Sequence, residues 1–326
     1  MVRPLAAWLL LMPFGLMTAI SPAVAAERGT IIREAIVYIS PDSASAKLGQ
    51  AERGREVVLL ERSRNWVQVE AMLGRANLPD PAFIEDQDAE QKTITGWMLD
   101  AGTVWSSTPN GDRILFGAAA DSEDEASKRH GRRGAAQDAL RLYYRVYDLF
   151  PNSPLAGEGL YRAADIRWQV EKSDMMSRPS AHEKQPIYRE GINEEQMKLV
   201  MKKFPGTKWA DLAAFHLIDN KLCGEWQGSS KCPEKEADLY DKYVKEHPQS
   251  PAAPEALYDA AWRRAALIEI YKTEEQAKKS EQAKNEAIAL CQQLVSQYAQ
   301  SDWSARGQAL LYMVQQGVPT YGNGLE

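Results

Sequence analysis

The pattern of hydrophobic and polar positions changes between the two halves of the chain. From residue 31 to about 105, short runs of β-branched and aromatic residues alternate with turn residues, which is typical of strands. Beyond residue 135, apolar residues recur three and four positions apart in stretches rich in Ala, Leu, Glu and Lys, which is typical of amphipathic helices. The sequence therefore predicts an α+β, multidomain protein with a β part followed by an all-α part.

Four runs in the β part predict strands, at residues 36–39, 57–60, 66–69 and 94–99. They are separated by turn signals at Pro41-Asp42, Gly54 and Arg64-Asn65. A polar insertion at 71–92 interrupts the last pair. Several short strands with tight turns predict a small barrel.

The same segment carries residues typical of the bacterial SH3 domain family. They are Pro41, Gly49 and Gly54, with "NWVQV" at 65–69 and "TGWM" at 95–98. Residues 31–105 therefore resemble this family, and the resemblance implies an SH3-like barrel that contains the insertion 71–92.

Aromatic residues of such barrels form a groove for a peptide or for peptidoglycan. The resemblance assigns this role to Tyr38, Trp66 and Trp97, and flat aromatic surfaces suit extended or proline-rich chains. The alternative is that these rings fill a small core that needs bulky side chains.

The helical part contains one layout four times, a helix with an apolar stripe, a turn and a second helix. The turns read "FPNSP" at 150, "FPGTK" at 204, "HPQSP" at 247 and "YAQSD" at 298, and each contains a hydroxyl residue suited to capping the second helix: Ser153, Thr207, Ser250 and Ser301. Repeated helix pairs predict an α-solenoid of about eight to ten helices over 136–316.

These turns, with their Ala-rich second helices, resemble the tetratricopeptide-like proteins of the bacterial envelope, of the outer-membrane assembly lipoprotein and Tol-Pal coordinator types. The resemblance implies a TPR-like scaffold whose concave surface binds envelope proteins or extended peptide segments. We place a linker at 106–135, with a leading helix that starts at Ser122 because Glu125 completes a capping box there. Residues 317–326 form a C-terminal tail.

The first 25 residues have the order of a secretory signal peptide. Arg3 precedes an apolar run, and small residues end at Ala25, where cleavage is expected. An uncleaved membrane anchor is the alternative, because the run approaches spanning length. No later segment of the sequence has an apolar run of that length. We expect an exported protein, periplasmic or associated with the cell envelope, without a membrane span after cleavage.

Three cysteines lie in the helical part. Cys223 and Cys232 flank a short loop rich in Gly and Ser, and an exported chain meets an oxidising compartment, so we predict a disulfide between them. A zinc site and a redox pair are the alternatives. Cys291 falls at an apolar position of the repeat and is expected to be a buried free thiol.

Signals for catalysis or for cofactors are lacking. The sequence has no phosphate-binding glycine loop, metal-ligand cluster or nucleophile elbow. The four histidines are scattered, and His247 takes the place of an aromatic ring in one of the repeated turns. A net charge of −6 argues against nucleic-acid binding. We expect no cofactor and no metal.

Together these patterns predict a noncatalytic envelope adaptor, in which the solenoid binds protein partners and the barrel binds peptide or peptidoglycan. Two alternatives remain. One is a peptidoglycan-processing enzyme whose catalytic carboxylates are far apart in the chain, and the other is a cell-wall sensor in which the barrel alone carries the function.

Overall fold

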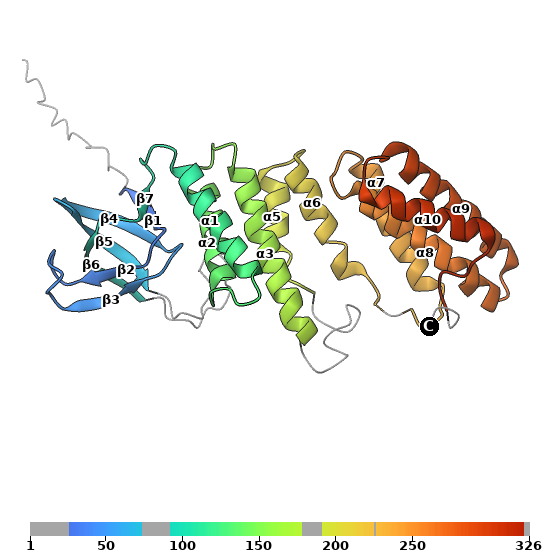
Figure 1. Cartoon of the computed structure of the whole chain (residues 1–326), viewed down its shortest axis with the longest axis horizontal. Coiled ribbons are helices and arrows are strands. Elements are labelled where there is room, and N and C mark those ends of the chain that lie inside the picture. Colours follow the sequence, from blue (N-terminus) through green and yellow to red (C-terminus); the bar gives the residue numbers. More distant parts are fainter. Residues whose placement is uncertain (1–25, 74–91, 178–190, 225, 323–326) are drawn as a thin grey trace, which may run out of the picture.

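The computed structural model describes residues 26–73, 92–177, 191–224 and 226–322. Figure 1 shows an elongated molecule with a β-sheet at one end, the helices α1 to α8 following along the long axis, and α9 at the far end with α10 beside α8. The predicted α+β organisation is confirmed. The predicted signal peptide and most of the insertion at 71–92 lie outside the described residues. None of the helices in the described ranges is long and apolar enough to cross a membrane.

The sheet has seven antiparallel strands in the order β3-β2-β6-β5-β4-β1-β7. The strands are β1 (Arg28–Ile31), β2 (Ala35–Tyr38), β3 (Lys47–Ala51), β4 (Glu56–Ser63), β5 (Trp66–Leu73), β6 (Lys92–Leu99) and β7 (Thr103–Trp105). The four predicted strands correspond to β2, β4, β5 and β6. Sequence patterns missed β1, β3 and β7, which are three to five residues long.

The sheet is open where a closed barrel was predicted. Among the described strands no pairing joins β3 to β7, so these two form the edges. Val104 of β7 instead packs into the apolar core of the first helices. Residues 71–73 and 92 also belong to β5 and β6, because these strands extend into the segment that was assigned to the insertion.

One face of the sheet forms a closely packed apolar core. Val37, Val67, Val69 and Met98 all have no exposed surface, and each alternates along its strand with a residue on the opposite face. This alternation fixes the register, since a shift by one residue would expose the whole apolar set.

The helical half contains nine α-helices within the described ranges. They are α1 (Gly111–Ser127), α2 (Ala135–Leu149), α3 (Ala156–Ser177), α5 (Glu195–Lys203), α6 (Lys208–His216), α7 (Lys231–Glu246), α8 (Ala253–Thr273), α9 (Ala277–Gln297) and α10 (Asp302–Gln316), with a short 3-10 helix at Asp219–Lys221. The helix predicted to start at Ser122 starts at Gly111. The Ser122 hydroxyl lies inside α1 and donates to the carbonyl of Ala118 at 3.0 Å, so it caps nothing.

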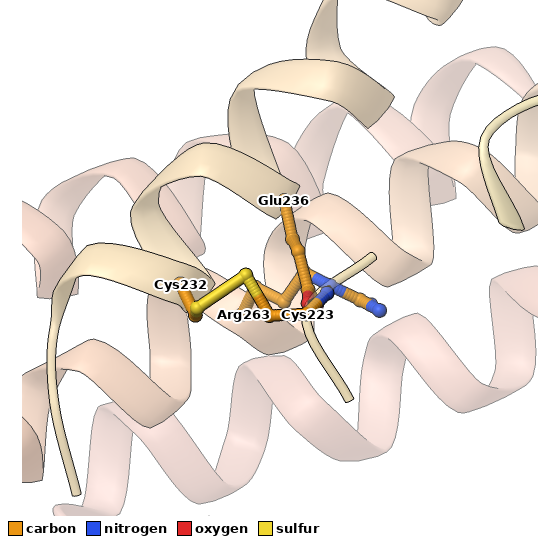
Figure 2. The surroundings of a disulfide bond; sticks show 4 residues. All are labelled: Cys223, Cys232, Glu236 and Arg263. Carbon is orange, nitrogen blue, oxygen red and sulfur yellow. Dashed lines mark hydrogen bonds and ion pairs between the residues drawn. A yellow bond between two sulfur atoms is a disulfide. The ribbon is translucent and has the colours of Figure 1, made fainter. Parts of the chain in front are cut away.

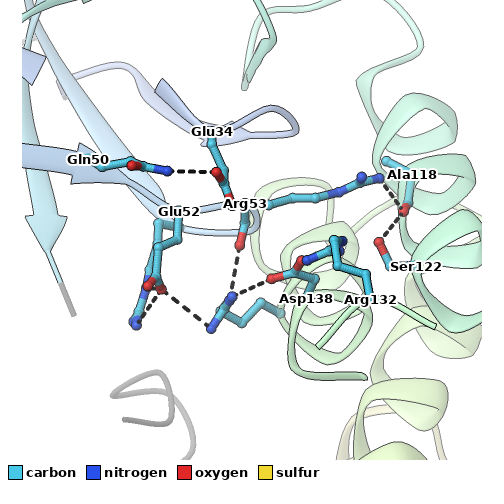
Figure 3. Close-up of polar contacts among 10 residues, drawn as sticks. Glu34, Gln50, Glu52, Arg53, Ala118, Ser122, Arg132 and Asp138 are labelled. Atoms are coloured by element: carbon cyan, nitrogen blue, oxygen red, sulfur yellow. Dashed lines mark hydrogen bonds and ion pairs between the residues drawn. The ribbon is translucent and has the colours of Figure 1, made fainter. Parts of the chain in front are cut away.

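The loop between β3 and β4 docks onto the first two helices (Figure 3). Arg53 Nη2 donates to the carbonyl of Ala118 on α1 at 2.8 Å. Arg141 on α2 donates from Nε to the carbonyl of Arg53 at 3.1 Å and pairs through Nη2 with Asp138 at 2.5 Å. These bonds, with Val104 of β7 packed into the core of the first helices, join the sheet to α1 and α2.

The four repeated turns have the same geometry. The helix before each turn ends at a ring residue whose φ lies between −123° and −129° and whose N–H donates to the carbonyl four residues earlier. These ring residues are Phe150, Phe204, His247 and Tyr298. The predicted hydroxyls then accept a backbone N–H. Thr207 and Ser301 cap α6 and α10 directly, whereas Ser153 and Ser250 accept the N–H two residues on, in the turn before their helix.

Two aromatic contacts also recur at equivalent positions of the repeat. Tyr161 on α3 lies against Trp209 on α6, with ring centroids 5.5 Å apart. Tyr258 on α8 lies against Trp303 on α10 at 5.2 Å. In both pairs the second helix of one unit contacts the start of the second helix in a following unit.

Candidate functional site

The three aromatic residues singled out in the β part lie on one face of the sheet. Tyr38 on β2 is directly opposite Trp97 on β6, and Trp97 is opposite Gln68 on β5. Trp66 is two residues from Gln68 and therefore shares its face. The rings of Tyr38 and Trp66 meet edge to face, with centroids 5.6 Å apart. The structure thus brings together residues from three strands.

This face is the one opposite the apolar core. Tyr38, Trp66 and Trp97 are all partly exposed, while the core side chains on the other face are fully buried. Ile36 and Leu99 extend the same face and are 37% and 44% exposed. We call these five residues the aromatic face. A contiguous exposed apolar patch is typical of a site of interaction.

The predicted disulfide between Cys223 and Cys232 is present, with the two Cα atoms 5.9 Å apart (Figure 2). Both sulfur atoms are therefore unavailable as zinc ligands. Across the described ranges no group of three or more potential metal-binding side chains is found. Cys291 is a free thiol with no exposed surface, and burial raises its pKa to about 12.

A pocket of about 530 Å³ lies beside this disulfide and was not anticipated. Its aromatic lining comes from Trp226 in the disulfide loop, Trp262 on α8 and Tyr321 in the C-terminal tail. Trp226 lies between the other two, with ring centroids 5.1 Å from Trp262 and 5.3 Å from Tyr321. The one local signal for this pocket was a tryptophan inside a short loop closed by cysteines.

The polar lining of the pocket includes Gln227 and an ion pair between α7 and α8. Arg263 donates from Nε to Glu236 Oε2 at 2.8 Å, and the other oxygen of Glu236 accepts the backbone N–H of Cys223 at 2.8 Å. Glu236 is 2% exposed and the Arg263 side chain is 10% exposed. The carboxylate of Glu236 thus holds both the arginine and one end of the disulfide loop.

The three histidines that the structure describes do not converge on a common site. His247 packs on the ring of Tyr243 at 4.9 Å, and its Nδ1 lies 2.8 Å from Asp211. His216 Nε2 lies 3.1 Å from Asp165. His130 is exposed, and His182 lies outside the described residues. The ring of His247 fills the turn position that phenylalanine or tyrosine fills in the other repeats.

No protein-family model matches the chain, and no curated protein matches it. Among solved structures, a chain described as "DHF58 filament" aligns with 63% of this chain and 91% of its own length, at 14% sequence identity and a TM-score of 0.23. A similarity at this TM-score carries no argument about fold or function.

Proposed function

We propose that the protein is a noncatalytic adaptor of the cell envelope, in which the sheet serves as an SH3-like binding module and the helices as a TPR-like scaffold. The aromatic face binds an extended peptide or a peptidoglycan strand. The helical repeats hold an envelope protein or an extended segment of one.

The observation that carries this proposal is the position of Tyr38, Trp66 and Trp97 on one exposed face. A ring that serves only the core is expected on the buried face, with the valines and Met98. Three large rings held by hydrogen-bonded strands form a rigid surface, so a ligand that stacks on them orders few protein side chains. This lowers the entropic cost of binding.

The recurrent turn geometry supports the scaffold role. Four helix ends share one backbone conformation, and each is followed by a hydroxyl that accepts a backbone N–H. Stacked helix pairs of this kind create long surfaces that are suited to protein partners. The disulfide at Cys223 agrees with an exported protein, because disulfides persist in oxidising compartments.

A pulldown with purified cell wall and with envelope extract tests the role of the aromatic face. We expect the double variant Tyr38→Ala/Trp66→Ala to lose most of the captured material. Tyr312→Ala is the matched control, since Tyr312 is 64% exposed on α10, away from the sheet. Unchanged capture by the double variant would refute the role of this face.

Zymography on cell walls separates the adaptor from a peptidoglycan-processing enzyme. The adaptor leaves the cell-wall gel intact. A clear zone of lysis at the position of the full chain would show catalysis and overturn the noncatalytic assignment.

A further inference from the structure

The pocket beside the disulfide is built differently from the aromatic face and lies in the other half of the molecule. We propose that it binds a neutral sugar ring, with the flat side of the ring on the aromatic side chains and the hydroxyls on Arg263 and Glu236. This inference is independent of the function proposed for the aromatic face.

The shape of the pocket suits a ring-shaped ligand of modest size. Trp226 is 8% exposed and contacts two half-buried rings of the lining, Trp262 and Tyr321, which we call the walls of the pocket. The volume of about 530 Å³ falls within the range of about 300–1,000 Å³ that is usual for small-molecule sites. The walls are held in place, because the disulfide fixes the loop of Trp226 and the Gly228 N–H donates to the Tyr321 hydroxyl at 3.4 Å.

Among the described residues, the charges around the pocket disfavour an ionic ligand of either sign. Arg263 is paired with Glu236 and also donates from Nη1 to Asp259 at 3.3 Å. An anionic ligand would meet the carboxylate of Glu236 in the lining, and the Arg263 guanidinium is already paired with two carboxylates. A cationic ligand would meet that guanidinium, whose centre already lies within 6.0 Å of the rings of Trp226 and Trp262. A neutral ligand avoids both penalties, and at the low effective dielectric of a recessed site these are large.

The unused hydrogen-bonding capacity of the ion pair selects hydroxyl groups. Arg263 uses Nε and Nη1, and among the described residues no partner is found for Nη2, which leaves its two N–H donors to a ligand. Each oxygen of Glu236 accepts one bond and has capacity for a second. Donors and acceptors thus lie side by side.

A sugar hydroxyl both donates and accepts, so neighbouring hydroxyls of one ring can satisfy Arg263 and Glu236 together. A carboxylate ligand brings only acceptors, and an ammonium ligand brings only donors. An extended peptide spaces its N–H and C=O groups along a groove, whereas neighbouring hydroxyls of one sugar ring converge on a single pocket.

Isothermal titration calorimetry on the full chain tests the proposal with two neutral trisaccharides, chitotriose and maltotriose. The fully deacetylated, cationic form of chitotriose and the anionic trigalacturonic acid serve as comparisons of the same size that carry charge. We expect saturable, one-site binding of at least one neutral sugar and weaker or absent binding of the charged sugars. If neither neutral sugar binds, or if a charged sugar binds more tightly than both, the proposal is wrong.

Variants locate the binding. Trp262→Ala and Tyr321→Ala are each expected to weaken the affinity by about tenfold, because each removes one stacking wall. Tyr321 follows the last helix, so its variant keeps the test valid even if Trp262→Ala fails to fold. Tyr312→Ala should bind the sugar as the unmodified chain does, whereas loss of binding in Tyr38→Ala/Trp66→Ala with binding kept in both wall variants would place the sugar on the aromatic face and overturn the assignment. Binding that survives both wall variants would place the sugar elsewhere and overturn the assignment.

Discussion

Arg141 on α2 donates its Nε–H to the main-chain carbonyl of Arg53, in the loop between β3 and β4, over 3.1 Å. The two residues are 88 positions apart in the sequence. In the opposite direction, the side chain of Arg53 reaches the carbonyl of Ala118 on α1. These two bonds, one in each direction, fix the sheet to the first helices, so a ligand on the sheet and a partner on the helices would be held in a defined relative position.

Replacing Arg141 tests this junction. Arg141→Ala removes a buried ion pair with Asp138 and the bond to Arg53, so we expect the free energy of unfolding to fall by about 3 kcal/mol. Urea denaturation followed by circular dichroism measures the change. Arg129→Ala is the control, because Arg129 is exposed and no ion pair is found for it among the described residues. Equal stability of the two variants would contradict a structural role for the junction.

Gly54 provides a second test of the same contact. Its φ of +81° disfavours other residues, and a Cβ added there would lie 2.7 Å from Cβ of Arg141. Gly134 has nearly the same backbone, with φ of +84°, but a Cβ there would meet nothing within 4 Å. We expect Gly54→Ala to destabilise the protein by about 1–3 kcal/mol more than Gly134→Ala, because only the former adds a clash. Equal losses in thermal melts would mean that the loop shifts to accept the methyl group.

The disulfide is expected to stabilise the fold and to shape the pocket. Cys223 and Cys232 are nine positions apart, and closing such a loop is worth about 2–3 kcal/mol in the chain-entropy estimate. The double variant Cys223→Ser/Cys232→Ser should lose about that much in urea denaturation. A reductant should produce the same loss in the unmodified chain and none in the variant, and a reductant effect on the variant would point to another cause.

Cys291 should be inert in the native protein. It has no exposed surface, and its raised pKa of about 12 leaves little thiolate at about pH 8. A thiol reagent used without reductant should label no cysteine in the folded chain and a single cysteine after unfolding in guanidinium. Labelling of three cysteines after unfolding would show that the disulfide is absent.

The same thiol predicts how stability depends on alkaline pH. The unfolded chain releases the Cys291 proton near its ordinary pKa of 9.0, whereas the folded chain keeps it until about 12. The unfolded state therefore loses protons first, and stability falls as the pH rises above 9. Tyr243, with a pKa raised to about 12 by burial, adds to this fall above pH 10. Urea midpoints across this range should decline less steeply for Cys291→Ala, and an identical slope would contradict the assignment.

Features that depend on neighbours in the chain were readable from the sequence. The repeated turns were found because each hydroxyl bonds to a backbone group within three residues, as Thr207 does with Ala210. The pairing of Cys223 with Cys232 was readable for the same reason. The start of α1 was not, because Asn110 precedes the helix without a side-chain cap, so no local residue marks the boundary.

The sequence by itself determined that a β part precedes a helical part, that one type of turn occurs four times, and that Cys223 pairs with Cys232. These features follow from local periodicity and from contacts between residues that are close in the chain. The family resemblance grouped Tyr38, Trp66 and Trp97, but only the tertiary structure places them on the face opposite the apolar core, since strand register is set by pairing across the sheet. It also decided the pocket, whose residues Trp226, Trp262 and Tyr321 come from separate elements. Residues from separate elements come together only when distant segments pack, and no local sequence pattern records that packing.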